Sequence, residues 1–169
     1  MSRSSVIVAI LMLASVTSGG AAHAERSVLT GHQGQDGLAR HAIYAEFTGT
    51  YAFLGYTASL DYEYRVGEHF ALSTGMTVLE KLPFIFDNTR ATYYGGRVIG
   101  HVLVGTGDHR LELAAGVSVL MDDDDGMVAP NAAVAWRYQP RDGGFVFRLG
   151  AMLSNGVGGP VGLAMGGAF

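Results

Sequence analysis

From Ala42 to the end of the printed chain, apolar and polar side chains alternate with a period of two residues. This period is typical of β-strands with two unlike faces, because successive side chains point to opposite sides. Short runs rich in glycine, asparagine, aspartate and proline interrupt the alternation, as turns do. The pattern predicts eight strands: Ala42–Thr50, Gly55–Val66, Phe70–Glu80, Tyr94–Val104, Arg110–Met121, Val128–Gln139, Phe145–Ser154 and Pro160–Phe169.

The two strand faces differ in size as well as in polarity. One face carries large apolar side chains, whereas the other combines charged groups with glycine and alanine, for example Gly116, Ala133 and Gly150. A solvated face has no need of such small residues, but the narrow interior of an eight-stranded barrel does. The sequence therefore predicts an all-β fold, an eight-stranded antiparallel up-and-down transmembrane β-barrel with apolar groups outside and polar groups inside.

The charges on the predicted inner face nearly balance, and the basic ones are arginines. Arginine suits buried pairs with carboxylates better than lysine does, and the chain's one lysine, Lys81, falls in a predicted loop. The predicted polar network of the lumen consists of Glu46, Asp61, Glu63, Arg65, Arg97, His101, Glu112, Arg137 and Arg148.

Aromatic residues gather at one predicted edge of the barrel. If the N-terminus lies on the periplasmic side, they fall at the inner ends of both outgoing and returning strands. An interfacial girdle of this kind is typical of membrane barrels. Its predicted members are Tyr62, Tyr64, Phe70, Trp136, Tyr138, Phe145 and Phe147, with Phe169 beside them.

The N-terminal segment predicts export. Arg3 precedes the apolar run Val6–Val16, and Ala22-His23-Ala24 has the small-x-small pattern of a cleavage site. The run is too short to cross a bilayer as a helix, which takes about 20 residues. We expect a signal peptide over 1–24, cleaved near Ala24 after export through the Sec route, a flexible leader over 25–41 and the barrel over 42–169.

Composition excludes several classes of function. Hydrophobic residues make up 49% and charged residues 15% of the 169 residues, which excludes a mainly disordered chain. The sequence has no cysteine, and its formal net charge of −4 argues against nucleic-acid binding. The histidine spacing fits no metal site on one strand face, and we expect neither a metal nor a cofactor.

The chain resembles the small eight-stranded outer-membrane β-barrels of Gram-negative bacteria. The resemblance covers roughly residues 42–169 and is carried by the stretches SLDYEYR, HRLELAAGV and WRYQPRDGGFVFRLG and by the last strand, PVGLAMGGAF. In that family, the barrel-insertion machinery recognises a final strand with alternating apolar residues and a terminal phenylalanine. The corresponding residues here are Val161, Leu163, Met165 and Phe169.

This resemblance implies a location in the outer membrane. We expect contact with lipid and lipopolysaccharide and a monomeric state. The expected role is structural or interactive: membrane integrity, surface contact or association with lipid. A soluble periplasmic lipocalin-like barrel is the alternative with the same strand number and the opposite polarity. Detergent-dependent extraction distinguishes the two.

Two barrel enzyme families, lipid A deacylases and palmitoyl transferases, give the enzymatic alternative. Met152-Leu153-Ser154-Asn155 is similar to the deacylase pattern His-x-Ser-Asn, but Met152 stands where that family has its base. A thioether accepts no proton, so the sequence predicts no deacylase activity. His101 faces the lumen, and nothing in the sequence pairs it with a nucleophile.

A small-solute channel is the third possibility. Side chains fill the interior of an eight-stranded barrel, so we expect no porin-like conductance. The sequence does not assign a function to two loop segments, the apolar stretch Leu82–Phe86 and the acidic run Asp122–Asp125. We expect the acidic run to be a hydrated loop tip rather than a calcium site.

Overall fold

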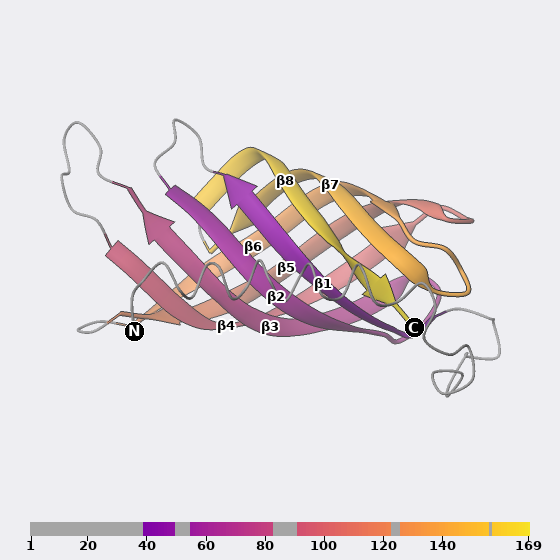
Figure 1. Cartoon of the computed structure of the whole chain (residues 1–169), viewed down its shortest axis with the longest axis horizontal. Helices are drawn as coiled ribbons and strands as arrows, with labels where there is room; N and C mark the ends of the chain where they lie inside the picture. The colour runs from indigo at the N-terminus through magenta and orange to yellow at the C-terminus, as the bar shows by residue number, and fades with distance from the viewer. Residues whose placement is uncertain (1–38, 50–54, 83–90, 123–125, 156) are drawn as a thin grey trace.

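The computed structural model is a closed eight-stranded antiparallel barrel (Figure 1). It describes residues 39–49, 55–82, 91–122, 126–155 and 157–169. The predicted signal peptide, most of the leader, and most of the segments Leu82–Phe86 and Asp122–Asp125 lie outside these ranges. No helix among the described residues is long and apolar enough to cross a membrane.

Each strand pairs with its neighbours in the chain, and β1 closes the barrel by pairing with β8 as well as with β2. The up-and-down topology predicted from the alternation is therefore confirmed. The strands are β1 (His41–Gly49), β2 (Gly55–Arg65), β3 (Phe70–Lys81), β4 (Ala91–Val104), β5 (His109–Met121), β6 (Gly126–Tyr138), β7 (Gly144–Ser154) and β8 (Val157–Ala168).

Three strands begin two or three residues earlier than the sequence pattern predicts. β4 begins at Ala91 rather than Tyr94, because its first residues continue the ladder with β3 as far as Lys81. β6 begins at Gly126, which pairs with Met121 of β5. β8 begins at Val157, three residues before the proline that marked its predicted start. In each case a neighbouring strand supplies hydrogen-bond partners that local propensity does not reveal.

One end of the barrel carries the short β2–β3, β4–β5 and β6–β7 turns, and we call it the short-turn end. The chain termini of the barrel also meet there, since the N–H of His41 donates to the main-chain oxygen of Phe169 at 2.9 Å. The other end, the loop end, carries the remaining connections (Figure 1).

Charged side chains are inside the barrel and large apolar side chains are outside. Neighbouring positions show this: Glu112 and Arg137 are 0% exposed, whereas Leu113 and Val134 are 41% and 54% exposed. Two small apolar clusters lie within the lumen as well. Tyr44 and Val146 belong to a cluster with four alanines, and Leu79 and Leu120 pack with Ala129 near the loop end.

The barrel closes with very close approach between β1 and β8. A Cβ atom on Gly166 would lie 1.9 Å from the carbonyl oxygen of Ile43 and 2.5 Å from Cα of Tyr44. These contacts involve backbone, which cannot move aside without disturbing the ladder. Glycine is therefore required here for the two strands to meet.

We expect Gly166→Ala to lower the free energy of unfolding by roughly 1–3 kcal/mol, as overpacking does. Gly100→Ala is the matched control, because its nearest neighbour would be the carbonyl oxygen of Ala115 at 3.8 Å. Urea unfolding followed by the fluorescence of Trp136 measures both changes. Equal midpoints for the two variants would contradict the close approach.

Candidate functional site

The structure places all nine residues of the predicted lumen network inside the barrel. Each of the nine is at most 7% exposed. Four arginines and four carboxylates face one another there, with His101 among them. Burial of unpaired charge costs several kcal/mol per ion, so this balance is what makes a charged interior tolerable.

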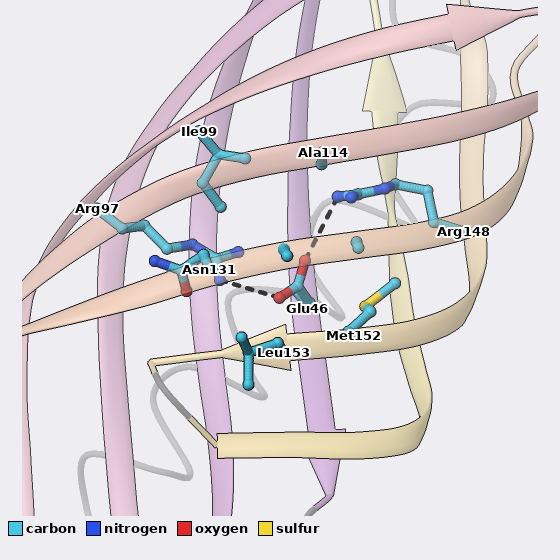
Figure 2. A pocket seen from close by; sticks show the side chains of 10 residues that line it. Glu46, Arg97, Ile99, Ala114, Asn131, Arg148, Met152 and Leu153 are labelled. Carbon is cyan, nitrogen blue, oxygen red and sulfur yellow. Dashed lines mark hydrogen bonds and ion pairs between the residues drawn. The ribbon is translucent and has the colours of Figure 1, made fainter.

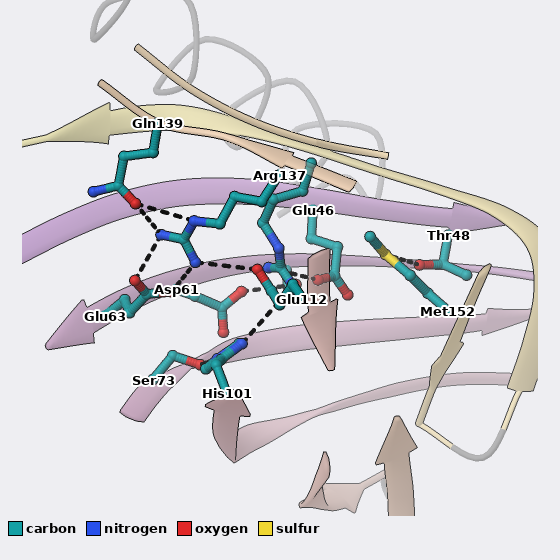
Figure 3. A network of polar contacts seen from close by, with 12 residues as sticks. Glu46, Thr48, Asp61, Glu63, Ser73, His101, Glu112, Arg137, Gln139 and Met152 are labelled. Carbon is teal, nitrogen blue, oxygen red and sulfur yellow. Dashed lines mark hydrogen bonds and ion pairs between the residues drawn. The ribbon is translucent and has the colours of Figure 1, made fainter. Parts of the chain in front are cut away.

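Arg137 on β6 organises the part nearer the short turns (Figure 3). Its two terminal nitrogens donate to the carboxylate of Glu63 at 2.8 and 2.7 Å. It also donates to Glu112 at 3.1 Å and to the amide oxygen of Gln139 at 3.0 Å through Nε. Gln139 in turn accepts from Arg65 at 2.6 Å. The planar guanidinium thus holds groups from β2, from β5 and from the residue that follows β6 in one geometry.

Arg97 and Arg148 organise the middle of the lumen. Arg97 donates to both oxygens of Asp61 at 2.8 and 2.5 Å and to Glu46 at 2.9 Å. Arg148 pairs with Glu46 at 3.4 Å and with Glu112. Glu46 and Glu112 therefore each bridge two arginines, and the pairs form one connected network.

Arg110, which the alternation also places inward, lies at the short-turn end instead of in this network. It donates to the main-chain oxygens of Glu68 and Gly107, at 2.6 and 3.2 Å. Arg110 thereby links the β2–β3 turn to the β4–β5 turn at the short-turn end.

The expectation that nothing pairs His101 with a nucleophile was wrong. Nε2 of His101 lies 2.8 Å from Oγ of Ser73, and Nδ1 lies 2.9 Å from Oε1 of Glu112 (Figure 3). Serine, histidine and carboxylate therefore follow one another in the order of a hydrolytic triad. The sequence missed this arrangement because Ser73 and Glu112 lie on β3 and β5, on either side of β4, and only the register brings them together.

This serine is closed off from solvent. Ser73 is 1% exposed and His101 is 2% exposed, deep between charged groups. A lumen void lies between Glu46, Arg97, Arg148 and Met152 (Figure 2), and Ser73 does not line it. The space open to the centre of a water molecule there is about 10 Å³, which holds about one water.

The residues of the deacylase-like pattern also point into the lumen. Ser154 Oγ accepts from Arg97 at 3.2 Å, and the sulfur of Met152 lies 3.9 Å from the hydroxyl of Thr48. Asn155, at φ 54°, donates through its amide to Thr77 at 2.7 Å. Its backbone N–H donates to Asn131 at 2.8 Å. Ser154 and Asn155, at the end of β7, thus point into the lumen near the loop end.

The aromatic side chains at the short-turn end form two clusters, each built on a histidine that the sequence analysis left out. His41 stacks on Phe169, with Tyr62 and Tyr64 beside it. His109 stacks on Trp136 at 5.4 Å between ring centroids, and the second cluster continues through Tyr138, Phe147 and Phe145. Phe70 is 59% exposed on the outer wall.

Other aromatic residues lie outside the single girdle that the sequence predicts. Phe47 and Tyr56 stack at the opposite end, with centroids 5.7 Å apart. Tyr44 lies inside, with its ring 4.9 Å from the guanidinium carbon of Arg148. Its position two residues before Glu46 on the inner face was the available signal. On β8, Val161 and Met165 face outward.

Metal binding has no evident place in the described part of the chain. Within those residues, no group of three or more histidine, aspartate or glutamate side chains is arranged to hold an ion.

Comparison with known proteins gives no relative: no family model, no curated protein and no solved structure matches this chain significantly.

We expect Arg137→Met to destabilise the barrel by about 3–5 kcal/mol, because it leaves the buried carboxylate of Glu63 without its arginine and removes one of the two arginines that bind Glu112. Arg141→Met, at an exposed turn position, should change stability by less than about 0.5 kcal/mol. Adding Glu63→Gln to Arg137→Met should recover part of the loss in a double-mutant cycle. Strict additivity in urea unfolding would contradict the pairing.

Proposed function

We propose that this chain is an outer-membrane protein of a Gram-negative bacterium that spans the membrane as a monomeric, plugged barrel and serves a structural or surface-contact role. The observation that carries the proposal is the inverted polarity of the wall. Large apolar side chains on every strand face outward, while the charged side chains of the strands, apart from Lys81 at the loop end, are buried inside the barrel. In water this arrangement would expose large apolar side chains to solvent. In a bilayer, the apolar outer face contacts lipid and the charged groups stay inside the barrel.

The aromatic clusters at both ends support the same placement. Tyrosine and tryptophan prefer the level of the lipid headgroups, and the clusters at the short-turn end and around Phe47 and Tyr56 bracket the apolar wall. Strands of 9 to 14 residues have the length that a tilted strand needs to cross the hydrocarbon layer. We therefore expect the outer wall to contact lipid and lipopolysaccharide. We also expect the barrel-insertion machinery to recognise the last strand by its outward apolar residues and Phe169.

Nitroxide labels test this placement directly, since the chain has no native cysteine. We expect labels at Leu113 and Val134 to be relaxed by oxygen, which concentrates in lipid, and to be shielded from a polar paramagnetic reagent. Labels at Lys81 and Arg141 are the water-exposed controls. Shielding of Leu113 and Val134 from both relaxing agents, in a protein that remains soluble without detergent, would contradict a membrane wall.

A plugged lumen argues against a channel. The paired arginines and carboxylates fill the middle, and Leu79, Leu120 and the inward Asn155 occupy the loop end. Moving an ion past them requires breaking several buried pairs, at a cost of several kcal/mol each.

We expect no stable porin-scale conductance in planar bilayers. Disrupting the network with the double variant Arg97→Ala and Arg148→Ala should produce small, flickering currents if its fold persists. Steady porin-scale current through the unaltered protein would contradict the plug.

In this function, the hydrogen-bonded residues Ser73, His101 and Glu112 have a structural role. Its geometry would activate a hydroxyl, yet a buried serine surrounded by charge pairs has no room for an acyl group. The three residues serve to satisfy one another's hydrogen bonds inside the barrel.

We expect the folded protein to resist labelling by a fluorophosphonate and to release no fatty acid from lipopolysaccharide. Labelling should appear only after unfolding, if at all. Fatty-acid release by the folded protein would overturn this view, and its loss in Ser73→Ala or in Ser154→Ala would show which serine is responsible.

A further inference from the structure

β6 is paired along its whole length on one side but along only part of its length on the other. Its ladder with β5 runs from Gly126 to Tyr138, whereas its ladder with β7 runs from Ala132 to Tyr138. Within the residues that the structure describes, no strand pairs with 126–131 on the β7 side. We call this stretch the free edge of β6.

The end of β7 turns away from the free edge instead of covering it. β7 ends at Ser154, and the backbone N–H of Asn155 donates to the side-chain oxygen of Asn131 at 2.8 Å. The side-chain amide of Asn155 donates to Thr77 on β3, which lies four strands away around the barrel. Ser154 and Asn155 therefore point into the lumen, and the free edge lacks the main-chain partners that β7 supplies to the rest of β6.

Pro130 lies in the free edge with its nitrogen toward the unpaired side. The N–H of Gln139, directly after β6, donates to the main-chain oxygen of Asp108 on the β5 side. Successive residues of a paired strand direct their main-chain groups to opposite neighbours, so Pro130, nine residues before Gln139, faces the β7 side. The oxygen of Val134 agrees with this assignment, because a Cβ on Gly150 of β7 would lie 2.2 Å from it.

A proline at this position leaves the β5–β6 ladder intact and removes a donor from the free edge. The register between β5 and β6 passes through the pair Val117 and Pro130 without a shift. On the unpaired side, Val128 presents both an N–H and a C=O, whereas Pro130 presents only a C=O. Within sheets, proline is found at such edges, where it hinders the approach of another strand.

The partner that suits this edge is the same edge of a second copy. Unpaired main-chain groups are costly in a bilayer, which favours pairing wherever two edges can meet. Two β6 edges can lie antiparallel about a twofold axis near Val128, so that position 130 faces Gly126 of the second copy. The outward side chains along the edge are apolar, and Val128 is 70% exposed. Apart from Pro130, the edge is therefore suited to self-association.

We propose that Pro130 prevents this barrel from pairing edge to edge with a second copy of itself. In the antiparallel arrangement, its missing N–H removes one hydrogen bond on each side of the axis, and its ring obstructs the carbonyl of Gly126 of the second copy. The inference rests on the membrane placement and the monomeric state proposed above. It goes beyond them by naming the surface through which copies would associate and the residue that blocks it.

The test replaces Pro130 with valine, which restores the N–H and suits a strand. We expect Pro130→Val to raise the dimer association constant, measured by sedimentation equilibrium in detergent, by about thirtyfold, the equivalent of two restored hydrogen bonds. Val128→Cys locates the contact, because the chain has no native cysteine. In phosphatidylcholine vesicles under oxidation, Val128→Cys should cross-link into dimers only when Pro130→Val is also present.

Pro140→Val is the matched control, because Pro140 lies in the β6–β7 turn at the short-turn end, away from the free edge. It should leave the protein monomeric. Leu113→Cys on β5 controls for contact through another part of the wall and should not cross-link with Pro130→Val. Pro130→Thr restores the same N–H and replaces the valine variant if that variant does not fold, as judged by the gel-mobility shift on heating.

Failure of this inference and failure of the proposed function give different results. Folded Pro130 variants that insert as monomers, or that cross-link equally through Leu113→Cys, would reject the role of Pro130 and leave the membrane function standing. Efficient cross-linking of Val128→Cys with Pro130 in place would reject both the inference and the monomeric state. If the unaltered protein does not insert into vesicles, as judged by protease protection, the membrane function fails instead.

Discussion

Neutrality inside a narrow barrel is the constraint on which the rest of this structure depends. Eight strands leave a lumen that side chains must fill, and here they fill it with charge. Four arginines and four carboxylates coexist because each has partners on other strands, with Glu46 and Glu112 each bridging two guanidinium groups. Such a network contributes less to net stability than to geometry, since desolvation offsets most of the Coulomb attraction.

The same network decides what the Ser73–His101–Glu112 chain does. Its distances satisfy the geometric criterion for an activated serine, but a catalytic group also needs a path for its substrate. Glu112 is held by Arg137 and Arg148 as well as by the histidine, which places the chain in the most crowded part of the lumen. Burial, rather than bond geometry, gives it a structural role in the function proposed.

The two ends of the barrel differ in how they are built. At the short-turn end, Arg110 donates to turn carbonyls, and His41 and His109 stack on outer aromatic rings. At the loop end, the lumen narrows to Leu79, Leu120 and the hydrogen-bonded amide of Asn155. Among the described residues, the histidines outside the lumen all lie at the short-turn end, and this distinguishes the two ends chemically.

The sequence by itself determined the strands and their alternation, because a period of two assigns each residue to a face without reference to its neighbours. It also indicated the inversion of polarity, because only a narrow interior needs glycine and alanine on the polar face. The alternation was enough to place Arg137 and Glu63 inside the barrel, but it did not show that the two side chains pair. The start of β4 at Ala91, the contact of His101 with Ser73, the inward turn at Asn155 and the stacking of His109 on Trp136 were decided by the tertiary structure. Each depends on the register between strands and on barrel closure, which bring together residues far apart in the chain.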